Sequence, residues 1–271
     1  MPPMRLVLVA ACLCLALCEA AAAPPAKSVF LEELTWTELR DDIRAGKTTV
    51  IVPVGGTEQS GPHMALGKHN VRAKVLAGRI AESLGNALVA PVIAYVPEGS
   101  IEPPAGHMRF AGTISIPEGA FETTLEYAAR SFRRHGFRDI VLIGDHGGYQ
   151  TSLVKVAAKL NREWAASPVR VHAVEDYYRA SVGGEFAQAL KRQGFSAEEI
   201  GTHAGVADTS LMMAIDPQLV RADRLHDGTP LGVAEGVYGD PRRSSAAAGK
   251  SGVELIIART RDAIQKEVAR R

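Results

Sequence analysis

The chain has 271 residues, with 31 basic and 30 acidic side chains and a formal net charge of +1. This balance argues against the broad charged surface that would bind nucleic acid or an anionic membrane, so we expect a small-molecule partner and no nucleic acid. Hydrophobic residues make up 46% of the chain. A chain of this size can bury a substantial core in one large domain.

The first 22 residues have the pattern of a secretory signal peptide. Arg5 precedes an apolar run over residues 6–17, and the alanines at 20–22 provide a small-residue cleavage site. The run has twelve residues, whereas a helix that spans a membrane needs about 20, which argues against an anchor. Leu17 is bulky for the position before a lipid-modified cysteine, which disfavours the alternative of a lipoprotein.

These features predict an exported protein, periplasmic or secreted, whose mature chain has no membrane span. We expect a short flexible start over residues 23–32 and a single domain over residues 33–271. All three cysteines, at positions 12, 14 and 18, fall in the predicted leader. A metal ion bound by the mature chain would therefore need His, Asp or Glu ligands.

Short β-branched runs alternate with apolar residues at helical spacing along the mature chain. Asn70 is the expected cap of the first of these helices, and Ser115 with Glu118 predicts a capping box at the next. We expect strands over residues 48–54, 87–96, 139–144 and 169–174, and helices over 70–84, 115–136, 150–164, 182–193 and 252–270. Residues 203–215 are expected to form a loop that enters a buried helix. The alternation predicts an α/β fold: a layered, mainly parallel sheet with helices on both faces and a ligand site at the carboxyl ends of the strands.

Five of the eight histidines lie beside glycine or in turns rich in glycine and proline, and most of these turns follow a predicted strand. Three turns combine imidazole with carboxylate: the first has Glu58, His63 and His69, the second has Asp145 and His146, and the third has His203 and Asp208. Carboxylate and imidazole are the ligands that Zn²⁺ or Mn²⁺ binds where no thiolate is offered. The turns therefore predict a shared metal site, with capping of backbone groups as the alternative reading of each turn alone.

At these residues the sequence resembles the creatininase family of metal-dependent amidohydrolases. The matching blocks are GGTEQSGPH (55–63), GHMRFAGT (106–113), GDHGGYQ (144–150), HAGVADTS (203–210) and GVYGDPRRSSAAAGK (236–250). The resemblance covers the chain from about residue 33 to near the C-terminus. It implies a layered α/β fold, a two-metal site with zinc or manganese, and hydrolysis of a carbon–nitrogen bond in a cyclic or small amide. It also implies a homo-oligomer, with a hexamer as the frequent form.

The family's ligand motifs are only partly retained. In Glu-Gln-His-Gly the histidine is replaced by Ser60, and the aspartate that bridges the metals is replaced by His69. Gly148 stands where creatininase itself has a glutamate, although many family members have glycine there. Asp208 stands where the family has a glutamate in His-Ala-Gly-x-x-Glu-Thr-Ser. We expect one tightly bound ion, although the family pattern allows one or two, with zinc as the first choice and manganese or iron as alternatives. The expected ligands are Glu58, His69, His146 and Asp208.

The expected reaction is hydrolysis by a metal-activated water. Asp208 or Glu58 would orient the water, and His203 would pass a proton to the leaving nitrogen, which makes His203 and Asp208 the expected catalytic residues. The expected substrate contacts are His63, His107, Arg109 and Tyr149. Two alternatives stay open at this point: an exported small-ligand-binding protein that lost catalysis through the changes at Ser60 and His69, and a lactonase or other esterase.

Overall fold

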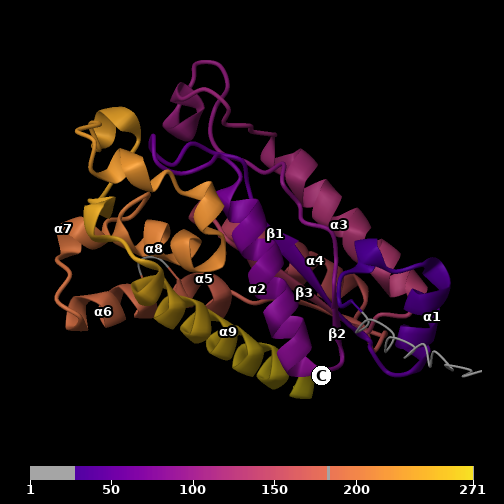
Figure 1. The fold of residues 1–271 in the computed structure, drawn as a ribbon. Coiled ribbons are helices and arrows are strands. Elements are labelled where there is room, and N and C mark those ends of the chain that lie inside the picture. Colours follow the sequence, from indigo (N-terminus) through magenta and orange to yellow (C-terminus); the bar gives the residue numbers. More distant parts are fainter. Residues whose placement is uncertain (1–27, 182–183, 271) are drawn as a thin grey trace, which may run out of the picture.

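The computed structural model describes residues 28–181 and 184–270 (Figure 1). The predicted leader lies outside the described residues. A four-stranded parallel sheet has the order β2-β1-β3-β4. Its strands are β1 (Thr49–Val54), β2 (Ala87–Val89), β3 (Asp139–Gly144) and β4 (Arg170–Ala173). Every residue of β1 and β3 is buried, as expected where helices cover both faces of a parallel sheet.

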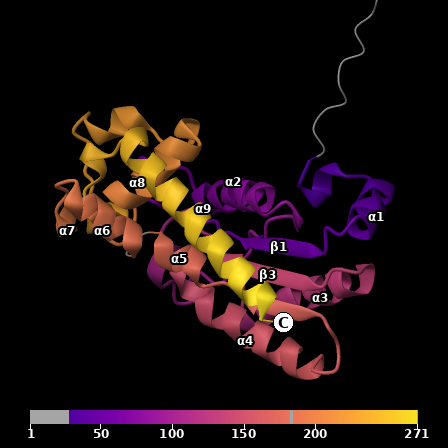
Figure 2. The ribbon, with the colours of Figure 1, turned by 90° about the horizontal axis from the view of Figure 1, so that it is seen from below.

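Nine α-helices lie in the described part of the chain. They are α1 (Trp36–Arg44), α2 (Lys68–Leu84), α3 (Glu118–His135), α4 (Gln150–Glu163), α5 (Asp176–Ala180), α6 (Glu185–Arg192), α7 (Ala197–Ile200), α8 (Val206–Ile215) and α9 (Ala246–Ala269). Figure 2 shows α2 on one side of the strands and α3 and α4 on the other, and α9 packs in the same core cluster as α2. This arrangement confirms the predicted α/β class with helices on both faces.

The two faces of the sheet form separate parts of the core, because successive side chains of a strand point in opposite directions. Ile51 and Val141 pack in the cluster that contains residues of α2, α5 and α9. Val50 and Ile140 pack in the cluster that contains residues of α3 and α4. Because helices pack on both faces of the sheet, the ends of its strands are well fixed and position the loops that follow them. No helix among the described residues is both long enough and apolar enough to cross a membrane.

Several local predictions are corrected by the structure. The strand expected over residues 87–96 ends at Val89, two residues before Pro91, which has no N–H for the ladder. α2 begins at Lys68 rather than at Asn70, whose Oδ1 instead accepts from the Gly56 N–H at 3.0 Å. The last helix begins at Ala246, earlier than expected. Of the start expected to be flexible, residues 28–32 are described, and Phe30 forms a parallel bridge with Val89.

The capping box expected at Ser115 and Glu118 is also absent. α3 begins at Glu118 after Pro117, which makes no side-chain cap. The hydroxyl of Ser115 instead donates to the Gly99 carbonyl at 2.8 Å and accepts from the Glu98 N–H at 3.0 Å. Ser115 therefore fixes the start of the loop over residues 97–112, and this loop reaches the site described next.

Candidate active site

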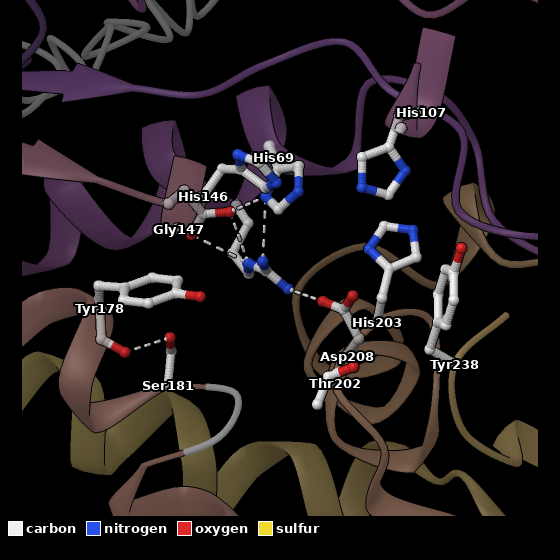
Figure 3. A pocket seen from close by; sticks show the side chains of 13 residues that line it. His69, His107, His146, Gly147, Tyr178, Ser181, Thr202, His203, Asp208 and Tyr238 are labelled. Atoms are coloured by element: carbon white, nitrogen blue, oxygen red, sulfur yellow. Dashed lines mark hydrogen bonds and ion pairs between the residues drawn. The ribbon is translucent and has the colours of Figure 1, made fainter. Parts of the chain in front are cut away.

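Polar side chains from several loops surround a cavity of about 320 Å³ beside the end of β3 (Figure 3). Its lining includes His69 of α2, His146 in the turn after β3, His107 of the long loop, and His203 and Asp208 before and within α8. The volume is at the small end of the range for small-molecule sites, roughly 300–1,000 Å³. The three predicted turns therefore meet at one cavity.

His69 lies between two buried carboxylates. Its Nε2 is 2.6 Å from Glu58 Oε1, and its Nδ1 is 2.6 Å from Asp145 Oδ2. Burial and the charge of Lys68 oppose protonation of the ring, but the carboxylates of Glu58 and Asp145 outweigh them and raise the pKa of His69. Both ring nitrogens then carry protons and donate, so in this arrangement His69 has no lone pair for a metal ion.

Two buried cations continue this chain of contacts. Arg72 bridges two carboxylates, with Nε 2.8 Å from Asp145 Oδ2 and Nη1 2.6 Å from Asp208 Oδ1. Lys68 Nζ forms an ion pair with Asp208 Oδ2 and lies 3.7 Å from Glu58 Oε1. The Ala204 N–H also donates to Asp208 Oδ2. Both oxygens of Asp208 are therefore occupied by cationic donors.

Six side chains thus form a closed ring of alternating charge, which we call the charged ring. Its members are Glu58, Lys68, Asp208, Arg72, Asp145 and His69. None of these side chains is more than 4% exposed. Three carboxylates face three cations, so the ring is neutral overall. Buried charges of this kind persist only when each is paired, and the ring pairs all of them.

Glu58 also faces a second environment, made of three imidazoles. His107 Nε2 is 3.2 Å and His146 Nε2 is 3.6 Å from Glu58 Oε2, and His203 Nδ1 is 3.6 Å from Glu58 Oε1. Within the described chain, Glu58 Oε2 accepts no hydrogen bond. We call His107, His146 and His203 the imidazole face (Figure 3).

The imidazole face is neutral at pH 7. Burial lowers the pKa of His146 to about 4 and that of His203 to about 3, and it also lowers the pKa of His107. The low pKa of Glu58, maintained against burial by His69 and Lys68, keeps its carboxyl ionised. An ionised carboxylate beside neutral imidazoles is the donor set that a divalent transition metal requires.

Gln59 positions two rings of this face. Its Nε2 lies 2.9 Å from His107 Nδ1, and its backbone carbonyl lies 3.0 Å from His203 Nε2. His203 Nε2 therefore donates to this carbonyl, which leaves Nδ1 with its lone pair toward Glu58 and the cavity. Gln59 is held in turn by the Gly236 carbonyl, 3.1 Å from its Nε2.

Three of the expected substrate contacts lie outside the cavity lining. The hydroxyl of Tyr149 is buried within 2.8 Å of the Val54 carbonyl and 2.6 Å of the Gly55 carbonyl, where it holds the end of β1. His63 is fully buried, with Nε2 3.0 Å from Thr209 Oγ1. Arg109 ends a short 3-10 helix, Gly106–Arg109, away from the lining, and His107 of the same helix does line the cavity.

Sequence reasoning missed Lys68, Arg72 and Glu98. Lys68 and Arg72 lie four residues apart, on the same face of the first turns of a helix. Cations are unfavourable at a helix N-terminus, so this pair indicates acidic partners nearby. Glu98 lies in an irregular loop with no periodicity. Burial and the charge of Glu58 raise the pKa of Glu98 to about 9, so its carboxyl is neutral at pH 7.

The buried His63 predicts a pH dependence of stability. Burial lowers the pKa of His63 from its ordinary value of 6.5 to about 4. Between these pH values the unfolded chain binds a proton that the folded chain does not, so acidification from about 6.5 to 4 destabilises the fold. A His63→Gln variant keeps a partner for Thr209 and cannot titrate. Between pH 6.5 and 4 the unfolding free energy of the variant should fall by roughly 1–3 kcal/mol less than that of the wild type. Urea unfolding of the metal-free proteins measures the difference. Identical pH slopes for the two proteins would contradict the assignment.

The parallel sheet places a carboxylate and neutral imidazoles at a small cavity. This arrangement is typical of α/β enzymes that bind a metal ion. The family model described as "Creatininase: Creatinine amidohydrolase" matches residues 32–264. The chain belongs to the creatininase family. It is therefore a metal-dependent hydrolase of carbon–nitrogen bonds, which confirms the family and the reaction class predicted from the sequence.

Individual relatives support this assignment. The chain is 33% identical over 211 residues to creatinine amidohydrolase of Pseudomonas putida, covering 75% of this chain and 78% of that protein. It is 31% identical over 222 residues to the mycofactocin precursor peptide peptidase of Mycolicibacterium smegmatis, covering 74% and 78%. A solved manganese form of creatininase superposes with a TM-score of 0.72 at 29% identity, covering 89% of this chain and 99% of that chain.

Proposed function

We propose that this protein hydrolyses a small amide, cyclic or linear, with a single divalent metal ion bound at Glu58. The observation that carries the proposal is the buried, ionised Glu58, whose Oε2 has no hydrogen bond within the described residues and faces neutral imidazoles. Zinc and manganese both fit a set of carboxylate and imidazole donors. The manganese form of the related creatininase supports the same choice.

The donor atoms present fit one ion. Among the described residues, two groups have ligand atoms within 4.8 Å of one another: Glu58 with His107 and His203, and Glu58 with Glu98 and His146. Both groups share Glu58, and its Oε1 is already held by His69 in the charged ring. Ser60, at the position where the resemblance implies a lost histidine ligand, belongs to neither group. One free oxygen of one shared carboxylate supports one ion.

In this proposal the expected ligands separate into two roles. Glu58 and His146 would bind the ion, as the sequence predicts. His69 and Asp208 would instead belong to the charged ring, where His69 orients Glu58 and Asp208 holds Lys68 and Arg72. Both ring nitrogens of His69 and both carboxylate oxygens of Asp208 contact charged protein partners.

The ion, when bound, would supply a Lewis acid that polarises the substrate carbonyl and lowers the pKa of water. The chain supplies the rest. His203 is neutral, its Nδ1 lone pair faces the cavity, and Nε2 is fixed on the Gln59 carbonyl, so His203 can take a proton and return it to the leaving nitrogen. Tyr178 and Tyr238 line the same cavity and would exclude water from around a small substrate.

Removal of the metal tests this proposal. Dialysis against a chelator should abolish turnover of the best substrate from a panel of creatinine, other cyclic ureides, N-formyl amines and simple lactams. One equivalent of Zn²⁺ or Mn²⁺ per chain should restore it, measured as amine or acid release. Full turnover by metal-free protein would contradict the proposal. Stabilisation by a panel compound without turnover would favour the exported binding protein instead.

We further propose that the protein is exported and acts as a homo-oligomer, with a hexamer as the expected form. Export is supported by the arrangement of Arg5, the apolar run and the alanines before residue 23. Oligomerisation is supported by the family resemblance.

A further inference from the structure

Glu98 is a buried carboxyl group that the mechanism above does not use. Its side chain is 0% exposed, and within the described residues neither of its oxygens makes a hydrogen bond. A buried carboxyl without donors is strongly disfavoured unless a missing partner completes it. We propose that Glu98 is a direct ligand of the metal ion, in a site formed by Glu58, Glu98 and His146. This inference rests on the proposed function, because it assumes that the site binds an ion.

The backbone makes specific room for this carboxyl. A Cβ atom at Gly56 would lie 2.5 Å from Glu98 Oε1, so no other residue at position 56 would leave the carboxyl in place. Gly56 also has a φ of +147°, which side chains rarely adopt. The Glu98 N–H donates to Ser115 Oγ at 3.0 Å, which fixes the main chain from the other side. The space at Gly56 and the hydrogen bond to Ser115 together position the Glu98 carboxyl beside Glu58.

Glu58, Glu98 and His146 can each offer one ligand atom that lies within 4.8 Å of those of the other two. Glu98 Oε2 lies 3.6 Å from His146 Nδ1, and Glu58 Oε2 lies 3.6 Å from His146 Nε2. Two ligands at tetrahedral positions around Zn²⁺, each bonded at about 2.1 Å, are about 3.4 Å apart. Each 3.6 Å distance is too long for a hydrogen bond and close to this value, and His146 would use one of its two nitrogens for the ion.

Charge favours the same group over the alternative one. The charged ring is neutral, so an ion bound by Glu58, His107 and His203 would gain no additional negative charge. Glu98 is the carboxyl outside the ring that lies within reach of Glu58. Binding of the ion would release the proton of Glu98 to solvent, so the ligating carboxylate would add one negative charge beside the dication. His107 and His203, both held by Gln59, would remain free to face the substrate.

Metal titration of four variants tests this ligand assignment. Chelator-treated protein is titrated with Zn²⁺ alone, in competition with a chromogenic chelator, to give affinity and stoichiometry. Glu98→Gln should weaken Zn²⁺ binding by more than about 100-fold. Loss of a residue that only hydrogen-bonds a metal ligand weakens binding by up to about 100-fold, so a larger loss indicates a direct ligand. Glu102→Gln removes an exposed carboxyl of the same loop and should leave the affinity unchanged. His107→Ala should change it by less than about tenfold, and Glu58→Gln should abolish binding.

The outcomes separate this inference from the proposed function. If the wild type binds no Zn²⁺, or Glu58→Gln binds it as the wild type does, the proposed function fails. If Glu58→Gln loses the ion while Glu98→Gln keeps the wild-type affinity, only this inference is overturned, and loss of binding in His107→Ala would place the ion in the other group. Unchanged melting temperatures of the metal-free variants show that they fold. Should Glu98→Gln not fold, Glu98→Asp keeps the charge but withdraws the carboxylate by one methylene, and wild-type affinity in that variant would equally overturn the assignment.

Discussion

A Glu58→Gln variant should retain no bound metal and should lose at least about 1,000-fold in kcat/KM. Glu58 belongs to both groups that could hold an ion, and its uncharged amide replacement cannot compensate a dication. The same change leaves His69 with one carboxylate partner instead of two, which should lower the pKa of that ring. Metal content by elemental analysis and initial rates on the best substrate measure the two effects.

Glu122→Gln provides the control for this loss. Glu122 of α3 pairs with the exposed Lys155 of α4 at 2.8 Å, and neither residue belongs to the cavity lining. Its replacement should leave metal content and rate as in the wild type. Full metal content in Glu58→Gln, or an equal loss in the control, would contradict the role of Glu58 as the anchor of the ion.

Replacing Arg72 by Met should lower the unfolding free energy by about 3–5 kcal/mol. Arg72 is 2% exposed and bridges Asp145 and Asp208, so its loss leaves two buried carboxylates short of a cation. Methionine fills a similar volume without charge, so the effect reports lost pairing more than a cavity. Urea unfolding at pH 7 of the metal-free protein gives the difference.

The matched control for this variant is Arg130→Met. Arg130 makes a two-point pair with Glu163, at 2.5 Å for each contact, but both side chains are partly exposed. Surface pairs contribute little because water screens them, so the unfolding free energy should hardly change. Equal small effects of the two substitutions would show that the charged ring does not stabilise the fold.

The parallel sheet was predictable because its two central strands carry their own signal. Residues 48–54, followed by Gly55, and residues 139–144, ending at Gly144, are short β-branched runs, and the structure places β1 and β3 there. The edge strand β2 was overestimated because the apolar pattern continues past Pro91, where the ladder stops. Ser115 matched a helix cap by spacing alone, but its hydroxyl is used by the loop that carries Glu98.

The convergence of the turns was also predictable, since loops after parallel strands meet at one sheet edge. Glu58, His69 and His146 lie within direct contact distances, as expected. The charged ring was not predictable, because Lys68 and Asp208 are 140 residues apart and a lysine at a helix start usually faces water. Glu98 reaches the site only because Gly56 leaves space for it, a steric relation that no local pattern encodes.

The binding of one ion at Glu58 is tested most directly by a crystal structure of the zinc-loaded protein, with anomalous diffraction recorded at the zinc edge. We predict one anomalous peak per chain, within about 2.2 Å of a Glu58 oxygen and of a His146 nitrogen. The charged ring should remain closed, with Lys68 still on Asp208. Two peaks per chain, or a single peak bound by His69 and Asp208 in place of their contacts with Lys68 and Arg72, would contradict this arrangement.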